Sequence, residues 1–179
     1  MPFDDEGLVV RRRDDNTWTV VEELVYRGRR DVFVVPAGFP TDFASVPRVV
    51  VWLVPRFGRY TLAAILHDWL CRDGIGAVLV SPRDADGLFR RAMRELGVPV
   101  VRRWLMWTGV RWGALTDPPR RAGWILSAPG VLVITALAAP VVVPPAVLVA
   151  LALTVYGFVE GIVSAPIRER PTDAGSAST

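Results

Sequence analysis

The residues best suited to chemistry are one histidine and three aspartates. His67 is the only histidine in the chain, and Asp68 follows it directly. Asp42 precedes this pair in a proline-rich loop, and Asp86 follows it on a later segment. In one arrangement, Asp42 and Asp68 supply hard oxygen ligands to a divalent cation such as Ca2+. Asp86 then orients the imidazole of His67, which acts as a general base. The candidate site is therefore catalytic at His67 and Asp86 and metal-binding at Asp42 and Asp68.

Each of these residues also has a simpler interpretation. A lone histidine on an apolar helix is more often a core or capping residue, and an aspartate after Thr41 can close an Asx-turn. Cys71 is the single cysteine, so it forms no disulfide within the chain, and as a nucleophile it would need a base close by. An open cleft containing His67 and the three carboxylates would favour an enzyme, whereas a His67 sealed in the core would count against one.

Two predicted helices carry most of these residues. The segment 60–71 is apolar on almost every face, which is typical of a buried helix. A second helix starts at Ser81, with serine at the N-cap, proline at the first helical position and Asp84 in a capping-box-like arrangement, and it ends at Gly97. Asp86 lies at the edge of its apolar stripe, so its carboxylate is expected to be partly buried and to need a partner. A third helix is predicted around 101–112.

Short β-branched and aromatic runs precede these helices. They cover residues 8–12, 18–26 and 32–35, and a tract resembling a hairpin turn, 27–30, separates the last two. The fold class that follows is α+β: a small antiparallel sheet packed with two or three helices over residues 1–117. Residues 118–123, which contain two prolines, are predicted to be a linker.

A long uncharged stretch explains why 51% of the residues are hydrophobic. No charged side chain occurs from Gly123 to Val159. A straight helix over these residues would be roughly 55 Å long, well beyond a hydrocarbon core of about 30 Å. The prolines at 140, 144 and 145 predict a break. The segment 124–165 is therefore expected to be a transmembrane helical hairpin with arms at 124–139 and 146–163.

The flanks of this hairpin suggest its orientation. Arginines precede the first arm and follow the second, which predicts that both termini lie on the cytoplasmic side of the membrane. One alternative is a pair of buried core helices, in the protein itself or in an oligomer. Another is a single span made by the second arm, with residues 124–139 at the membrane interface. Residues 166–179 are expected to be a polar, disordered tail, and the acidic N-terminus does not resemble a signal peptide.

Three motifs resemble a known family. They cover Phe39 to Arg48, Ala63 to Leu70, and Arg83 to Phe89 with Met93 and Gly97. On these residues the stretch from Leu8 to Trp112 resembles domain of unknown function 1353, which occurs often in phage and prophage genomes. The sequence departs from the family pattern at Phe43, where glycine is usual, and at Cys71, where an aromatic residue is usual. The hydrophobic segment looks like an addition to that domain.

A more distant similarity is to bacterial secreted phospholipases A2. Those enzymes have a loop aspartate, then a helix with a His-Asp pair, then a second helix whose aspartate orients the histidine. Asp42, His67 with Asp68, and Asp86 occur in the same order. The resemblance implies that Asp42 and Asp68 help to hold calcium, that His67 activates water and that Asp86 fixes the tautomer. The disulfide framework of those enzymes is absent.

Two functions follow as expectations. The first is a membrane-anchored phage or prophage domain with a structural or partner-binding role at the cytoplasmic membrane or in a virion, with membrane lipids and phage structural proteins as partners. The second is a metal-dependent hydrolase of lipid or peptidoglycan. A nucleic-acid partner is not expected. All 21 basic residues are arginine, and aspartates and glutamates interleave with the arginine clusters at 11–13 and 27–30.

Overall fold

Short strands in the first quarter of the chain are followed by helices. The structure is a computed structural model that describes residues 2–4, 7–28, 31–43, 46–77, 79–121 and 123–164. The chain divides into two compact units, Met1–Pro140 and Val141–Thr179. The first unit has the α+β composition expected from the sequence, and the long apolar helix α5 (Trp124–Ser164) continues from it into the second.

The strands form two small antiparallel sheets. They are β1 (Val10–Arg12), β2 (Trp18–Val20), β3 (Leu24–Arg27), β4 (Val32–Val35) and β5 (Pro40–Thr41). One sheet has the order β1-β2-β5, and β3 pairs with β4 in the other. The run at 18–26, predicted as one strand, is thus split into β2 and β3. The interruption falls at Val21, Glu22 and Glu23, which are all exposed and lie outside the strands.

The helices follow the predicted order. They are the 3-10 turn η1 (Arg48–Val50), α1 (Thr61–Trp69), the π-helical turn η2 (Leu70–Gly74), α2 (Pro82–Glu95), α3 (Val100–Gly113), the 3-10 turn η3 (Ala114–Thr116) and α4 (Pro118–Arg121). Ser81 caps α2 as expected, because its Oγ accepts a hydrogen bond from the Asp84 backbone N–H at 3.1 Å. Residues 118–123 were expected to be a linker, but they contain α4, in which Arg120 is buried.

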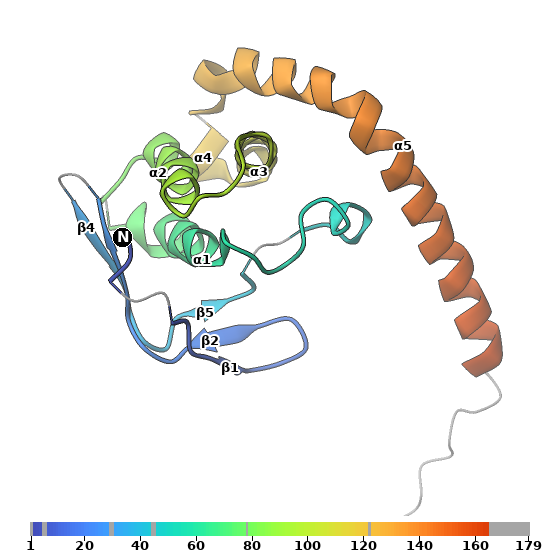
Figure 1. Cartoon of the computed structure of the whole chain (residues 1–179), viewed down its shortest axis with the longest axis horizontal. Coiled ribbons are helices and arrows are strands. Elements are labelled where there is room, and N and C mark those ends of the chain that lie inside the picture. Colours follow the sequence, from blue (N-terminus) through green and yellow to red (C-terminus); the bar gives the residue numbers. More distant parts are fainter. Residues whose placement is uncertain are drawn as a thin grey trace, which may run out of the picture. The chain divides into compact units, whose positions relative to one another are not determined.

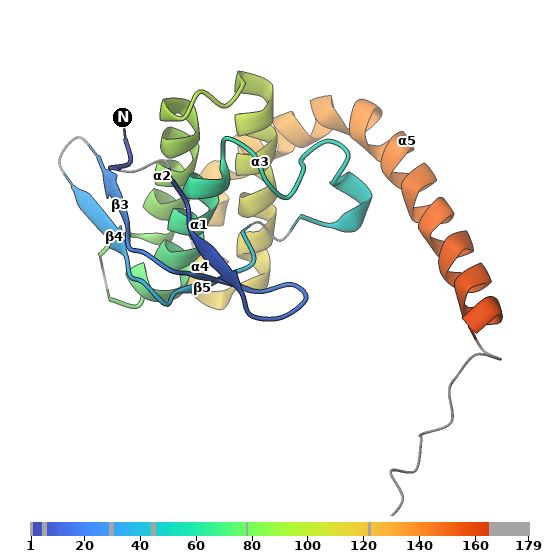
Figure 2. The same ribbon diagram turned by 60° about the horizontal axis from the view of Figure 1, so that its bottom comes forward.

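Helix α1 is central to the first unit. It packs against β3 and β4 on one side and against α2 on another, and α2 packs in turn against α3 (Figures 1 and 2). Its residues Leu62 to Leu66 are all buried, which confirms the prediction of a buried helix. The apolar stripe of α2 adds Phe89, Ala92 and Met93 to the same core. The last turn of α1 therefore presents its side chains to α2 inside the domain.

The C-terminal segment differs from the predicted hairpin. α5 is one continuous helix through its four prolines, Pro129, Pro140, Pro144 and Pro145, so the expected break at 140–145 is absent. Each proline removes one backbone donor, and at the expected break Pro140 and Pro144 are only one turn apart. The tail predicted for 166–179 lies outside the described residues, as does Ala165.

Candidate functional site

The candidate site lies where the end of α1 meets α2. His67 is in the last turn of α1, and Asp86 is in the second turn of α2. The His67 Nε2 lies 2.7 Å from the Asp86 Oδ1, and the His67 ring packs on Phe89 with 4.8 Å between ring centroids. The structure thus brings together the two residues predicted to be catalytic. Their catalytic roles stay predictions.

The carboxylate of Asp86 has two further partners. Arg111 of α3 donates from Nη1 to Oδ2 at 2.6 Å, and Arg120 of α4 donates from Nη2 to Oδ1 at 2.7 Å. Burial alone raises the pKa of Asp86, but His67 and the two guanidinium groups outweigh it and hold that pKa below its ordinary value. Asp86 is therefore an ionised carboxylate in the core that joins α1, α2, α3 and α4.

The arginine partners connect this carboxylate to the start of α5. Arg111 also donates from Nε to the Ser127 Oγ at 2.8 Å, and Ser127 donates to the Trp124 backbone carbonyl at 2.9 Å. The Nη2 of Arg111 and the Nε of Arg120 are buried without a hydrogen-bond partner among the described residues. Two positive charges therefore face one negative charge in this cluster, before His67 is counted.

The protonation of His67 depends on this environment. Burial alone lowers the pKa of its imidazole, but hydrogen bonds with Asp86 and Cys71 outweigh burial and raise that pKa from 6.5 to about 9. Asp86 accepts from the ring nitrogen, so its charge stabilises the imidazolium. At neutral pH the imidazole is therefore mainly protonated, a form that donates protons and does not accept them.

Cys71 is a neighbour that the sequence reasoning did not place in the site. Its Sγ lies 3.4 Å from the His67 Nε2. The signal was available, because residues four apart on a helix lie on the same face. One donor atom each from His67, Cys71 and Asp86 lie within 4.8 Å of one another. A dication held there would sit beside Arg111 and Arg120, which already bind both Asp86 oxygens, so the present charge distribution does not suit a metal.

The two predicted metal ligands, Asp42 and Asp68, lie outside that cluster. The Oδ1 of Asp68 lies 3.0 Å from the Nε of Arg72, and its Oδ2 is buried. Burial raises the pKa of Asp68, Arg72 opposes the rise, and the nearby charge of Asp42 adds to it. Asp42 and Asp68 are therefore close, but neither belongs to the cluster of His67, Cys71 and Asp86.

The accessibility of the site counts against an open catalytic cleft. The His67 side chain is 11% exposed and that of Asp86 is 1% exposed. A groove beside α2 is lined by other residues of that helix, among them Gly87, Leu88 and Arg91, and not by His67 or Asp86. The His67–Asp86 pair is thus mostly enclosed by protein.

The comparison with protein families identifies the domain. A family model described as a protein of unknown function, DUF1353, matches residues 18–110, just over half of the chain. The chain belongs to the DUF1353 family. No curated protein and no solved structure matches it. The DUF1353 match includes His67, Cys71 and Asp86, but Arg111 and Arg120 lie beyond its C-terminal end.

Phe43 shows how this DUF1353 domain accommodates one departure from the family pattern. Its φ of 65° is in the left-handed region, where the glycine expected from the resemblance is favoured. The ring packs against Trp18 and Phe57, with centroid distances of 5.8 and 4.9 Å. The Phe43 backbone N–H donates to the Thr41 Oγ1 at 3.0 Å. Aromatic packing and this hydrogen bond therefore support a backbone conformation that a side chain makes unfavourable.

Replacing Asp86 tests the ion cluster. Asp86→Asn leaves two buried guanidinium groups without a negative partner, so we expect the free energy of unfolding to fall by about 3–5 kcal/mol. Asp73→Asn removes the same charge at an exposed position and should change it by less than about 0.5 kcal/mol. Denaturant titration of both variants measures the difference. Equal stability of the two variants would show that the cluster is not a structural centre.

The single histidine allows a direct titration. We expect the NMR signal of the His67 ring to titrate near pH 9, and Asp86→Asn to lower the midpoint. The folded-state pKa lies above the unfolded value of 6.5. The stabilisation by His67 is therefore complete below about pH 6.5 and is lost as the pH rises through about 9. His67→Gln should flatten this dependence. A midpoint at or below 6.5 would contradict the assignment of Asp86 as its dominant partner.

Proposed function

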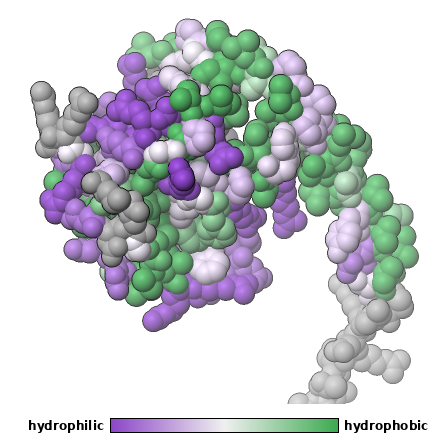
Figure 3. Space-filling view, viewed as in Figure 1, coloured by the Kyte–Doolittle hydropathy of each residue, from purple (hydrophilic) through white to green (hydrophobic). Residues whose placement is uncertain are grey.

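We propose that this protein is a membrane-anchored DUF1353 domain that binds a protein partner at the cytoplasmic membrane. The observation that carries the proposal is the apolar surface of α5 in the second unit. From Val141 to Ser164 the helix contains one charged residue, Glu160, and every residue from Leu151 to Ser164 is exposed. Figure 3 shows many hydrophobic residues, with paler ones between them, on the visible face of this part of α5. A bilayer is a solvent that suits such a surface.

The side-chain hydroxyls of this segment are also compatible with a lipid environment. The Thr154 hydroxyl donates to the Ala150 carbonyl at 2.9 Å, and the Ser164 hydroxyl donates to the Glu160 Oε1 at 3.1 Å. Within a hydrocarbon core such groups must be satisfied internally, because no water is available to them. Glu160 lies near the C-terminal end of the proposed span, where its carboxylate can reach the interface.

The length of α5 favours one crossing of the membrane. All 41 residues would extend roughly 60 Å, twice the thickness of a hydrocarbon core. The part before Val141 belongs to the first unit, since Val131 is buried and the Trp112 Nε1 donates to the Thr135 Oγ1 at 3.0 Å. The remaining 24 residues extend roughly 36 Å, enough to span with some tilt.

A single crossing changes the proposed orientation. The hairpin placed both termini in the cytoplasm, whereas one span puts the domain and the C-terminus on opposite sides. We propose that the domain, which contains 19 of the 21 arginines, is cytoplasmic. Its protein partner is proposed to be a phage structural protein, as the family resemblance implies, and a place in a virion is the alternative location.

Charged substitutions on α5 distinguish one crossing from two. Leu148→Arg with Leu151→Arg places two charges in the proposed span, at about 2.5–3.5 kcal/mol each near its centre. We expect this variant to be released by carbonate extraction of membranes, while the wild type stays in the pellet. The matched control, Leu126→Arg with Leu132→Arg, changes exposed leucines of the first unit and should stay in the pellet. Release of both variants would favour a hairpin, and release of the wild type would exclude anchoring.

A hydrolase is the second candidate, favoured by the hydrogen bond between His67 and Asp86. In this proposal Asp42 and Asp68 hold calcium, and the deprotonated fraction of His67 activates water at a lipid ester. The mostly enclosed pair must then open to admit substrate. The test measures fatty-acid release from phospholipid vesicles with and without Ca2+. A calcium-dependent rate that His67→Ala abolishes and Asp73→Ala preserves would support the hydrolase. No release, or release that survives His67→Ala, would exclude His67 chemistry on lipid.

A further inference from the structure

Strand β4 has a free edge in the described part of the chain. Its one partner there is β3, with Val25 opposite Val34 and Arg27 opposite Val32. The Val25 carbonyl and the Arg27 N–H bond instead to Asp4 and Pro2, away from β4. In an antiparallel pair, residues opposite each other point their backbone groups either inward together or outward together. The N–H and C=O groups of Val32 and Val34 therefore point away from β3.

These four backbone groups are open to another strand. None of them has a backbone partner among the described residues. The side chains of Val32 and Val34 are also exposed, at 54% and 41%. Natural edge strands are usually protected by charged residues, proline or a bulge, and within β4 itself none of these occurs. The edge is thus suited to pairing with an additional strand.

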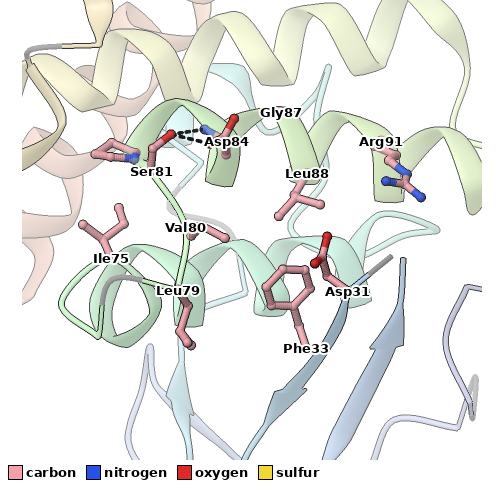
Figure 4. A pocket seen from close by; sticks show the side chains of 11 residues that line it. Asp31, Phe33, Ile75, Leu79, Val80, Ser81, Asp84, Gly87, Leu88 and Arg91 are labelled. Carbon is pink, nitrogen blue, oxygen red and sulfur yellow. Dashed lines mark hydrogen bonds between the residues drawn. The ribbon is translucent and has the colours of Figure 1, made fainter. Parts of the chain in front are cut away.

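A groove lies alongside this strand. It has a volume of about 710 Å³ and is lined by β4, by α2 and by the turn that follows η2. Figure 4 shows Phe33 on the strand, Leu88 on α2, and Ile75, Leu79 and Val80 on the turn, arranged around it. A strand added to β4 would direct alternate side chains towards this apolar lining, because successive side chains of a strand point to opposite faces.

The charges at the groove favour a basic partner. Asp31 and Asp84 both line it; the charge of Asp31 interacts with that of Arg91, and the Asp84 Oδ2 accepts a hydrogen bond from the Ser81 hydroxyl at 2.6 Å. Arg91 is the basic residue of the lining, and its Nε is 2.9 Å from the Glu95 Oε1, so its charge is already compensated. Among the described lining residues, two carboxylates thus stand against one guanidinium, a net charge of minus one.

We propose that an extended peptide segment of a partner protein binds by adding a strand to the free edge of β4. It has apolar residues at alternate positions, which enter the groove, and an arginine or lysine that meets Asp31 or Asp84. Val32 and Val34 provide four backbone hydrogen bonds for affinity, and the groove provides side-chain selection. The inference rests on the partner-binding role proposed above and names the surface and the class of ligand.

A second copy of this chain fits the groove less well. Pairing β4 with β4 of another copy would need side chains from that copy to enter the groove. The inward side chains of β4, Phe33 and Val35, are buried in the core of their own domain. A peptide without its own core can supply such side chains, so a peptide satisfies both the edge and the groove.

The test uses the full-length chain in detergent micelles and immobilised ten-residue peptides that alternate Val, Leu, Ile or Phe with Thr and end in Arg. Val34→Pro removes the outward N–H, and Val34→Thr is its control. Gly87→Leu fills the groove from α2, where an added Cβ meets nothing within 4 Å, and Gly87→Ala is its control. Leucine and alanine both favour helix over glycine, so the Gly87 variants are expected to fold.

We expect at least one Arg-ended peptide to bind, and Val34→Pro and Gly87→Leu each to weaken that binding tenfold or more. The two controls should bind within threefold of the wild type. Replacing the terminal Arg of the peptide by Glu should weaken its binding to the wild type, and this loss of affinity should be smaller for Asp31→Asn. Absence of any binding peptide, or equal binding to all variants, would refute the proposal. If the wild type is a dimer and Val34→Pro is a monomer, the occupant of the β4 edge is a second copy of the chain and not a peptide. The peptide-binding measurement in micelles does not need a bilayer. Its result therefore tests the β4 edge even if the carbonate extraction shows that the chain is not anchored in a membrane.

Discussion

One buried carboxylate, that of Asp86, organises the first unit. An ionised group in the core is stable only if partners replace its lost hydration. His67, Arg111 and Arg120 supply that replacement from three different helices. The approach of α1, α3 and α4 to α2 is therefore coupled through one side chain. The same contacts explain why the chemistry expected of His67 is restricted, since its imidazole is held in the charged form.

The contact of His67 with Asp86 follows from local sequence signals. The capping box at Ser81 fixes the start of α2, and this start places Asp86 at the edge of a buried stripe. Its arginine partners could not be predicted in the same way, because they lie 25 and 34 residues further along a chain with 21 arginines. Nothing in the local pattern distinguishes Arg111 or Arg120 from the others, and their selection depends on tertiary packing.

Other differences between expectation and structure have equally local causes. The β-branched run at 18–26 predicts one strand, yet its two glutamates stay exposed where the chain passes from β2 to β3. The prolines of α5 predict a break, but the helix is continuous through them. As a nucleophile Cys71 needs a base close by, and His67 lies one turn before it, with its Nε2 3.4 Å from the Cys71 Sγ.

The shortness of β4 has a consequence for how tightly anything could bind there. Two outward residues offer at most four backbone hydrogen bonds, and each contributes about 1 kcal/mol net. Such an edge is weak for partners that diffuse freely in three dimensions. In the proposed membrane-anchored form, a partner held in the same membrane would be present at a raised effective concentration, which a weak site needs. In this protein, the apolar helix would then set the occupancy of a groove on a different part of the chain.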